Sequence, residues 1–301
     1  MAIYHCSVKI GSRSNGASSV GSCAYRESVK IKDERLGIEH DYSRKSGVVE
    51  SFTMTPENAP TWARDSAKLW NEVEHIEKRK DAQVFREVVV ALPRELDREK
   101  QQQLVTDYTK RNFVDEGMCA TVAIHETEHQ NPHAHIMLTT RTISEDGFGK
   151  KQRDWNQKNR LESWRSDWSQ SVNQALQRDG LAVRVDHRSL EQQGISRTPQ
   201  IHVGKTATAM ERKGIETERG DRNREITTSN QDMARFIQQG IHSARKQFEA
   251  HKAQEAARKA EALVQQQLRE REAKAQEMER RQKEVLERSS KQKSQGRGWS
   301  L

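Results

Sequence analysis

The chain contains 301 residues, of which 32% are charged and 33% are hydrophobic, and it carries a formal net charge of +8. This composition allows one substantial folded domain but is too polar for a compact fold throughout. The sequence has no apolar run near 18 residues and no signal-peptide pattern, so we expect no membrane insertion and a cytoplasmic location. Three widely spaced cysteines, Cys6, Cys23 and Cys119, fit a reducing compartment rather than a disulfide scaffold or a zinc finger.

The positive charge is concentrated toward the C-terminus. Residues 229–301 contain 16 Lys and Arg against 10 Asp and Glu, a net charge of +6, which leaves only +2 for residues 1–228. The N-terminal part is therefore nearly balanced. Any nucleic-acid surface on it must come from local clustering of basic side chains rather than from overall charge.

The first elements are a strand, a turn and a short helix. Residues 3–9 alternate in the manner of a strand, residues 11–16 form a glycine-bounded turn that contains Arg13, and residues 17–29 favour a helix that carries Tyr25.

Strands and helices then alternate as far as Pro199. We predict further strands at 48–54, 84–91, 118–125 and 133–141, and helices at 62–77, 99–113 and 158–178. The last helix has apolar residues at spacings of three and four, which indicates a core-facing stripe. Hairpin strands interspersed with helices favour an α+β fold with a mainly antiparallel sheet, helices packed largely on one face, and the other face available for a site.

The most informative segment runs from His125 to His135. Residues 121–124 and 136–140 favour two strands joined by a polar Asn-Pro turn. Because side chains alternate along a strand, His133 and His135 share one face, and a hairpin returns His125 opposite them. Three imidazoles that converge in this way could hold a catalytic metal and leave coordination positions open. His129, in the turn, is expected to be solvent-exposed rather than a fourth ligand.

Other interpretations of these residues remain open at this point. A His-x-His pair also occurs as the ordinary polar face of a sheet. A nucleophile is needed as well, and the four tyrosines, Tyr4, Tyr25, Tyr42 and Tyr108, each fit an amphipathic residue with a buried ring and a solvated hydroxyl. Residue chemistry alone does not choose among them.

Beyond Pro199 the sequence favours a long helix. There is no further proline and no glycine between Gly240 and Gly296, and Met233, Ile237, Ile241 and Phe248 follow a helical stripe that thins out afterward. We expect a linker at 206–228 and a charged, mainly helical region at 229–301. Its distal part could be a single solvated helix, a weak coiled coil with another protein, or partly disordered.

Three ordered blocks carry a family resemblance. The blocks MAIYHCSVKIGSRS with SCAY, FREVVVALP, and HETEHQNPHAHIML resemble the relaxases of the MobA/MobL type, over about residues 1–205. These are HUH endonucleases, named for a His-hydrophobe-His pair that His133-Ala134-His135 reproduces. The resemblance implies an HUH relaxase fold and an enzyme that nicks one DNA strand at a plasmid origin of transfer.

The resemblance also implies roles for individual residues. Tyr25 would attack the scissile phosphodiester and become joined to the 5′-phosphate, while His125, His133 and His135 would hold a divalent metal, with magnesium or manganese as the expected ion. Glu87 matches an acidic position near the metal, either as a ligand or as a partner that orients a histidine. Implied partners are origin-of-transfer DNA as a single strand, accessory relaxosome proteins and a coupling protein. Candidate contacts to the DNA backbone are Arg13, Lys150, Lys151, Arg153 and Arg188.

Three alternatives in function accompany this interpretation. A rolling-circle replication initiator shares the histidine pair and the nucleophilic tyrosine, although the N-terminal position of Tyr25 favours the relaxase. A DNA-binding regulator could keep the fold without catalysis, and a metal hydrolase could use water instead of tyrosine.

Overall fold

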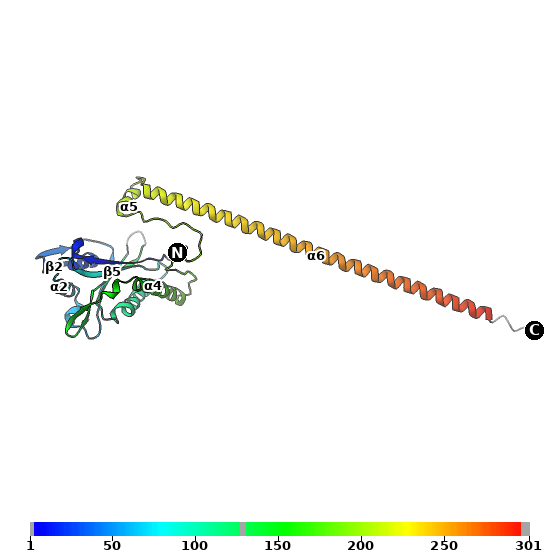
Figure 1. Cartoon of the computed structure of the whole chain (residues 1–301), viewed down its shortest axis with the longest axis horizontal. Coiled ribbons are helices and arrows are strands. Elements are labelled where there is room, and N and C mark those ends of the chain that lie inside the picture. The colour runs from blue at the N-terminus through cyan, green and yellow to red at the C-terminus, as the bar shows by residue number, and fades with distance from the viewer. Residues whose placement is uncertain (1–2, 127–130, 296–301) are drawn as a thin grey trace, which may run out of the picture. The chain divides into compact units, whose positions relative to one another are not determined.

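The structure is a computed structural model that describes residues 3–126 and 131–295. The chain divides into two compact units, Met1–Ser189 and Leu190–Leu301 (Figure 1). His129 lies outside the described residues, so its predicted exposure stays a prediction.

The first unit is built on a five-stranded antiparallel sheet with the strand order β1-β5-β7-β6-β4. Its strands are β1 (Cys6–Ser12), β4 (Val48–Met54), β5 (Gln83–Ala91), β6 (Ala120–His125) and β7 (His133–Leu138). All five strands were predicted, and the predicted class, α+β with an antiparallel sheet and a long C-terminal helix, is confirmed.

The first strand is displaced from its predicted bounds. It covers Cys6–Ser12 rather than residues 3–9, because its pairing with β5 continues through Gly11, opposite Phe85. A Cβ atom on Gly11 would lie 2.2 Å from the Phe85 ring. The glycine that suggested a turn is therefore needed within the strand, where the aromatic ring crosses the backbone.

One face of the sheet is covered by α3 (Arg98–Thr109) and α4 (Lys158–Arg178). Side chains from alternate positions of β5, β6 and β7 pack against these helices in one buried cluster, which includes Val88, Val90, Val122, Ile136, Leu104, Tyr108, Trp164 and Trp168. The predicted apolar stripe of residues 158–178 is thus a core face, as its spacing indicated.

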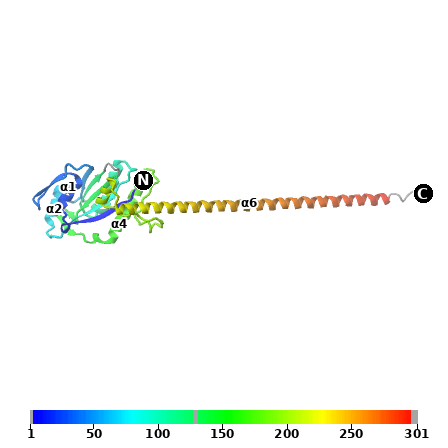
Figure 2. The ribbon, with the colours of Figure 1, turned by 90° about the horizontal axis from the view of Figure 1, so that it is seen from above.

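The opposite face is covered only in part. There α1 (Ser19–Glu27) and α2 (Ser66–Ile76) lie side by side (Figure 2) and pack over Phe85 and Met137. Trp70 of α2 also donates a hydrogen bond to Thr121 of β6, 2.9 Å from Nε1 to Oγ1. Helices therefore contact both faces, whereas we expected them largely on one. The strand ends that carry the histidines remain accessible beside α1, since His133 and His135 are only partly buried.

Several short elements were not predicted. Two hairpins are added by β2 (Lys30–Asp33) with β3 (Ile38–Asp41) and by β8 (Arg141–Ser144) with β9 (Gly147–Lys151). Short helical turns occupy Arg13–Asn15, Thr61–Arg64 and Asp154–Asn156, and α3 continues into a π-helical turn at Lys110–Val114. The predicted helix at 62–77 is split, because the Asp65 carboxylate accepts a hydrogen bond from the Lys68 backbone and starts α2 there.

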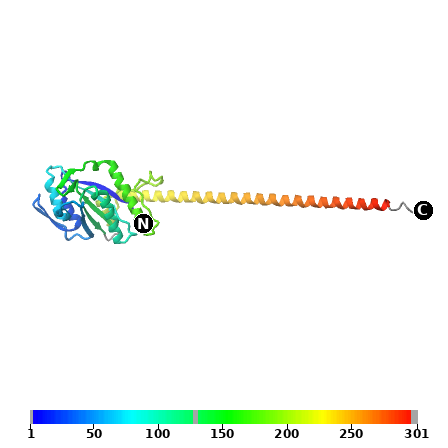
Figure 3. The same cartoon turned by 90° about the horizontal axis from the view of Figure 1, so that it is seen from below.

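The second unit contains α5 (Lys205–Arg212) and α6 (Glu218–Gln295), so the segment predicted as a linker, 206–228, is largely helical. The 78-residue α6 is one uninterrupted helix in both side views (Figures 2 and 3). Residues 231–289 are all exposed, and these include the apolar stripe through Phe236 and Ile241. Whether functional domains divide at 205 and 229 stays a prediction. Within residues 3–126 and 131–295, no helix has both the length and the apolar composition needed to cross a bilayer.

Candidate metal and nucleophile site

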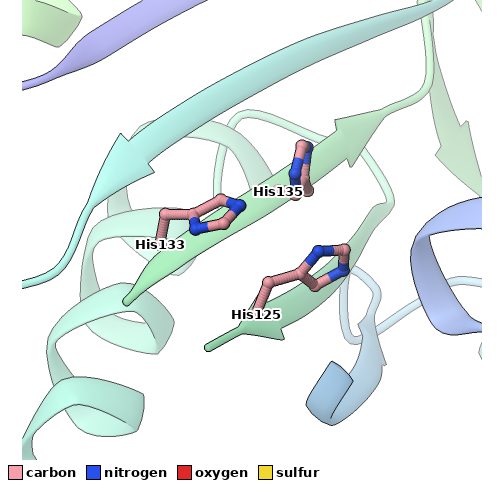
Figure 4. A group of neighbouring side chains, drawn as sticks. All are labelled: His125, His133 and His135. Carbon is pink, nitrogen blue, oxygen red and sulfur yellow. The ribbon is translucent and has the colours of Figure 1, made fainter. Parts of the chain in front are cut away.

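The three histidines of the sequence motif converge at one end of the sheet (Figure 4). In the β6–β7 ladder His125 lies directly opposite His133, and His135 lies one pleat further along the same face. The ring centroids are 5.4 Å apart for His125 and His133, 4.7 Å for His125 and His135, and 5.2 Å for His133 and His135. One nitrogen from each ring lies within 4.8 Å of the others. The hairpin register thus produces the convergence that the sequence predicts.

Each imidazole is oriented by a hydrogen bond on its other nitrogen. His125 Nε2 lies 2.7 Å from the Arg26 carbonyl oxygen, and His133 Nδ1 lies 2.8 Å from the Asn131 carbonyl oxygen. A carbonyl oxygen only accepts, so these nitrogens carry the proton and donate. His135 Nδ1 donates in the same way to the Glu87 carboxylate at 2.7 Å. The nitrogens left with free lone pairs are Nδ1 of His125 and Nε2 of His133 and His135.

Burial favours the neutral form of His125 and His133, and hydrogen bonds favour the charged form of Glu87. Loss of solvation lowers the pKa of His125 from 6.5 to about 4 and also lowers the pKa of His133. Burial alone would raise the pKa of Glu87, but hydrogen bonds from His135 and Arg26 outweigh it and lower that pKa to about 2. Two of the imidazoles are therefore unprotonated at neutral pH, as metal ligation requires.

This donor set fits a divalent ion. One nitrogen of each ring lies within 4.8 Å of the others, each ring is held by a hydrogen bond, and an open side remains because His133 and His135 are partly exposed. Imidazole donors suit transition ions such as manganese or zinc better than magnesium, whose preferred ligands are oxygens. The Glu87 carboxylate accepts a hydrogen bond from Nδ1 of His135 and is not part of the group of three histidines. Of the two predicted roles, its position therefore fits a partner that orients a histidine rather than a metal ligand.

The four tyrosines lie in different environments. Tyr4 and Tyr108 pack into the cluster under α3 and α4, on the sheet face away from the histidines, and their hydroxyls donate to the carbonyls of Arg165 and Trp164. Burial raises the pKa of both phenols above the usual value. Neither hydroxyl is therefore placed to act as an accessible nucleophile.

Tyr25 lies in the last turn of α1 and is 45% exposed. Tyr42 packs against its ring edge to face at 5.2 Å between centroids. The Lys45 ammonium lies 4.3 Å from the Tyr25 ring centroid and donates a 3.0 Å hydrogen bond to the Tyr25 carbonyl oxygen. The positive charge of Lys45 also adds to the lowering of the pKa of His125 and of His133.

Arg26 is the residue that the sequence analysis missed. Its backbone carbonyl accepts the hydrogen bond from His125, and its guanidinium forms an ion pair with Glu87. Nothing in the sequence separates this arginine from the many others, except that it directly follows Tyr25.

The predicted DNA contacts have different environments. Arg13 is 10% exposed and is held by the buried carboxylate of Glu74, so a phosphate could reach it only by breaking that ion pair. Lys151 pairs with Glu77, and Arg188 pairs with Asp186. Lys150 and Arg153 are exposed and form no ion pair within residues 3–126 and 131–295. Together with Lys151 they line a groove of about 580 Å³, whose other basic residues are Arg79 and Arg141.

The chain is similar to proteins of bacterial gene transfer. The MobA/MobL family matches residues 17–213. The conjugal transfer protein TraA of Agrobacterium fabrum (strain C58) is 37% identical over 267 residues, covering 76% of this chain and 24% of TraA. The mobilization protein MobL of Acidithiobacillus ferridurans is 36% identical over 253 residues, covering 73% of this chain and 66% of MobL. The chain thus spans about a quarter of the length of TraA.

A solved structure described as the molecular basis of vancomycin resistance transfer in Staphylococcus aureus is also similar. It is 33% identical, aligns with a TM-score of 0.59, and covers 62% of this chain and 100% of its own. The sheet and helices of the first unit therefore have a known counterpart in fold.

The lowered pKa of His125 predicts an acid-sensitive fold. Because His125 takes up a proton near pH 4 when folded but near pH 6.5 when unfolded, the unfolded state binds more protons between these values, and stability falls as the pH drops through this window. Urea unfolding of the metal-free protein between pH 7 and pH 4 measures this loss. In His125→Gln, which keeps an amide donor but does not titrate, the decline should be shallower. His75→Gln, at an exposed histidine of α2, is the control and should follow the wild type. Equal declines in wild type and His125→Gln would contradict the assignment.

Proposed function

Because this chain belongs to the MobA/MobL family, we propose that it is a plasmid mobilization relaxase that cuts and rejoins one strand at an origin of transfer. The observation that carries the proposal is the convergence of three imidazoles beside the last turn of α1, which presents Tyr25. The hydrogen bond from His125 to the Arg26 carbonyl joins the helix to the histidines directly.

In the proposed reaction, the Tyr25 oxygen attacks the phosphorus of one phosphodiester. A bond forms between phosphorus and the tyrosine oxygen while the bond to the 3′ oxygen of the preceding nucleotide breaks. The phenol proton is lost to solvent, and the departing 3′ oxygen takes up a proton. A 5′-phosphotyrosyl link and a free 3′-hydroxyl result. Since one ester replaces another, the reverse step rejoins the strand.

The residues around Tyr25 favour this attack. The attack places additional negative charge on the phosphate oxygens, so nearby positive charge stabilises its transition state. Lys45 places its ammonium against the Tyr25 ring. A divalent ion, when bound by the three imidazoles, supplies Lewis-acid polarisation of a non-bridging phosphate oxygen. Glu87 accepts from Nδ1 of His135 and so leaves Nε2 of that ring free to hold such an ion.

The proposal also includes a DNA substrate and protein partners that contact the chain outside the histidine site. Origin-of-transfer DNA, presented as a single strand, would follow exposed cations, of which Lys150 and Arg153 are the accessible candidates in the groove beside β9. Accessory relaxosome proteins and a coupling protein belong to the same proposal, as does action in the bacterial cytoplasm. These features rest on the family and on the chain's similarity to conjugal transfer and mobilization proteins.

The proposal predicts a covalent adduct that depends on Tyr25. Labelled single-stranded oligonucleotides that tile the DNA around the gene, incubated with the protein and Mn²⁺, should yield one oligonucleotide that remains attached on a denaturing gel. Tyr25→Phe should abolish the adduct because no oxygen is left to form the ester. Tyr42→Phe, at the ring packed against Tyr25, is the matched control and should retain it. His133→Ala and His135→Ala should reduce it strongly.

Three other results would redirect the interpretation. An adduct in Tyr25→Phe would mean that another tyrosine is the nucleophile. Cleavage without any adduct would indicate attack by water. Specific binding without cleavage in either Mn²⁺ or Mg²⁺ would favour a DNA-binding regulator.

The exposed cations of the groove predict a change in salt dependence. If Lys150 and Arg153 each contact one phosphate, the double variant Lys150→Ala/Arg153→Ala should reduce the slope of log affinity against log salt by about 1.4, at roughly 0.7 per contact for a single strand. Fluorescence anisotropy with a labelled oligonucleotide measures the slope. Lys110→Ala/Arg111→Ala removes the same charge beside the covered sheet face and should leave the slope unchanged. Equal slopes in all three proteins would place the DNA elsewhere.

A further inference from the structure

Arg26 contacts the histidine site through two different groups. Its backbone carbonyl accepts the 2.7 Å hydrogen bond from His125 Nε2, and its side-chain Nε donates to Glu87 Oε1. The same Glu87 oxygen accepts the 2.7 Å hydrogen bond from His135 Nδ1. One residue, directly after Tyr25, therefore reaches two of the three histidines.

The Arg26 side chain is fixed at several points. Besides the ion pair with Glu87, its Nη1 donates to the Ser22 carbonyl at 2.7 Å, one turn earlier in α1, and its guanidinium lies 5.5 Å from the Phe85 ring centroid. The side chain of Arg26 is 15% exposed and that of Glu87 is 8% exposed. A charge-assisted hydrogen bond that is this well shielded from water is stronger and more directional than one at the surface.

These contacts cross three strands. Glu87 belongs to β5, His125 to β6 and His135 to β7, while Arg26 belongs to α1. Rotation or sliding of the last turn of α1 would break the ion pair with β5 and the hydrogen bond with β6 together. Tyr25 precedes Arg26 by one residue, so its Cα is held 3.8 Å from the Cα of the residue that makes both contacts.

We propose that Arg26 is a positioning residue that couples the last turn of α1 to the metal ligands. Through Glu87 it fixes the His135 ring, and through its own backbone it fixes the His125 ring, so that the helix carrying Tyr25 and the nitrogen trio form one rigid arrangement. The role of Arg26 toward Tyr25 rests on the proposed function, whereas its role toward the histidines does not.

The two contacts can be separated by mutation. Arg26→Gln removes the guanidinium and leaves the backbone carbonyl that His125 uses, so only the route through Glu87 is lost. Arg26→Lys keeps a cation but lacks the planar group that donates to Glu87 and Ser22 at once. Lysine should therefore restore part of the effect.

The first test measures metal binding without DNA. Isothermal titration of the full chain with Mn²⁺ should show about tenfold or more weaker binding for Arg26→Gln, and an intermediate loss for Arg26→Lys, since partners that orient metal-ligating histidines typically contribute 10- to 100-fold in affinity. Arg13→Gln is the matched control, because Arg13 is 10% exposed and pairs with the buried Glu74 of α2. This control should lower the thermal stability of the metal-free protein and leave Mn²⁺ affinity unchanged.

The second test measures positioning of Tyr25. At saturating Mn²⁺ and saturating oligonucleotide, the single-turnover rate of adduct formation should fall about tenfold or more in Arg26→Gln, while the Kd for the oligonucleotide stays at the wild-type value. A slow step with unchanged binding is expected when a reacting group is held less accurately.

The outcomes are decisive in both directions. If Arg26→Gln binds Mn²⁺ as tightly as the wild type while its melting temperature falls, Arg26 is only structural and the inference is wrong. If it unfolds at room temperature, Arg26→Lys provides the same comparison. An adduct that persists in Tyr25→Phe would overturn the proposed function and leave the metal-affinity result for Arg26 standing.

Discussion

The site depends on one structural constraint, the register of the β6–β7 hairpin. His125 and His133 pair directly across the ladder, and the alternation of side chains places His135 on the same face. A shift of one residue in this pairing would turn the β7 histidines into the core under α3 and α4 and bring Ala134 and Ile136 to the open face. The packing of those apolar residues therefore stabilises the histidine arrangement indirectly. The histidine cluster and the hydrophobic core are specified by the two faces of the same strands.

A second constraint is the direction of the hydrogen bonds around the imidazoles. Two carbonyl oxygens and one carboxylate accept from the histidines, and each acceptor selects which nitrogen keeps its lone pair. Burial favours the neutral form of His125 and His133, and Glu87 remains ionised because His135 and Arg26 both donate to it. The fixed tautomers and the ionised carboxylate therefore match what the binding of a cation requires. A set of histidines without these acceptors would be free to rotate and would have no preferred tautomer.

The sequence predicts the regular parts of this fold well, for identifiable reasons. The strand at Val48–Met54 and the helix at Lys158–Arg178 were predicted with the observed bounds, because their apolar residues follow clear periods. The hairpin of β8 and β9 was missed although Asp146-Gly147 is a strong turn signal, with Gly147 at φ 96°. Convergence of the histidines followed from alternation alone. The contacts of Arg26 could not be predicted in this way, because they are made with residues about 60 and 100 positions away in the chain.

The contact between His125 and Arg26 also provides a hydrogen-bond donor for a carbonyl group at the C-terminal end of α1. The last carbonyl groups of a helix have no partner within it, and together they carry a partial negative charge. In α1, the Tyr25 carbonyl accepts from the Lys45 ammonium and the Arg26 carbonyl accepts from His125. Both donors are groups that such helix ends favour. The end of the helix thus needs donors, and the imidazole needs an acceptor to free its other nitrogen. One hydrogen bond satisfies both requirements, so the turn that carries Tyr25 and the orientation of His125 share one contact.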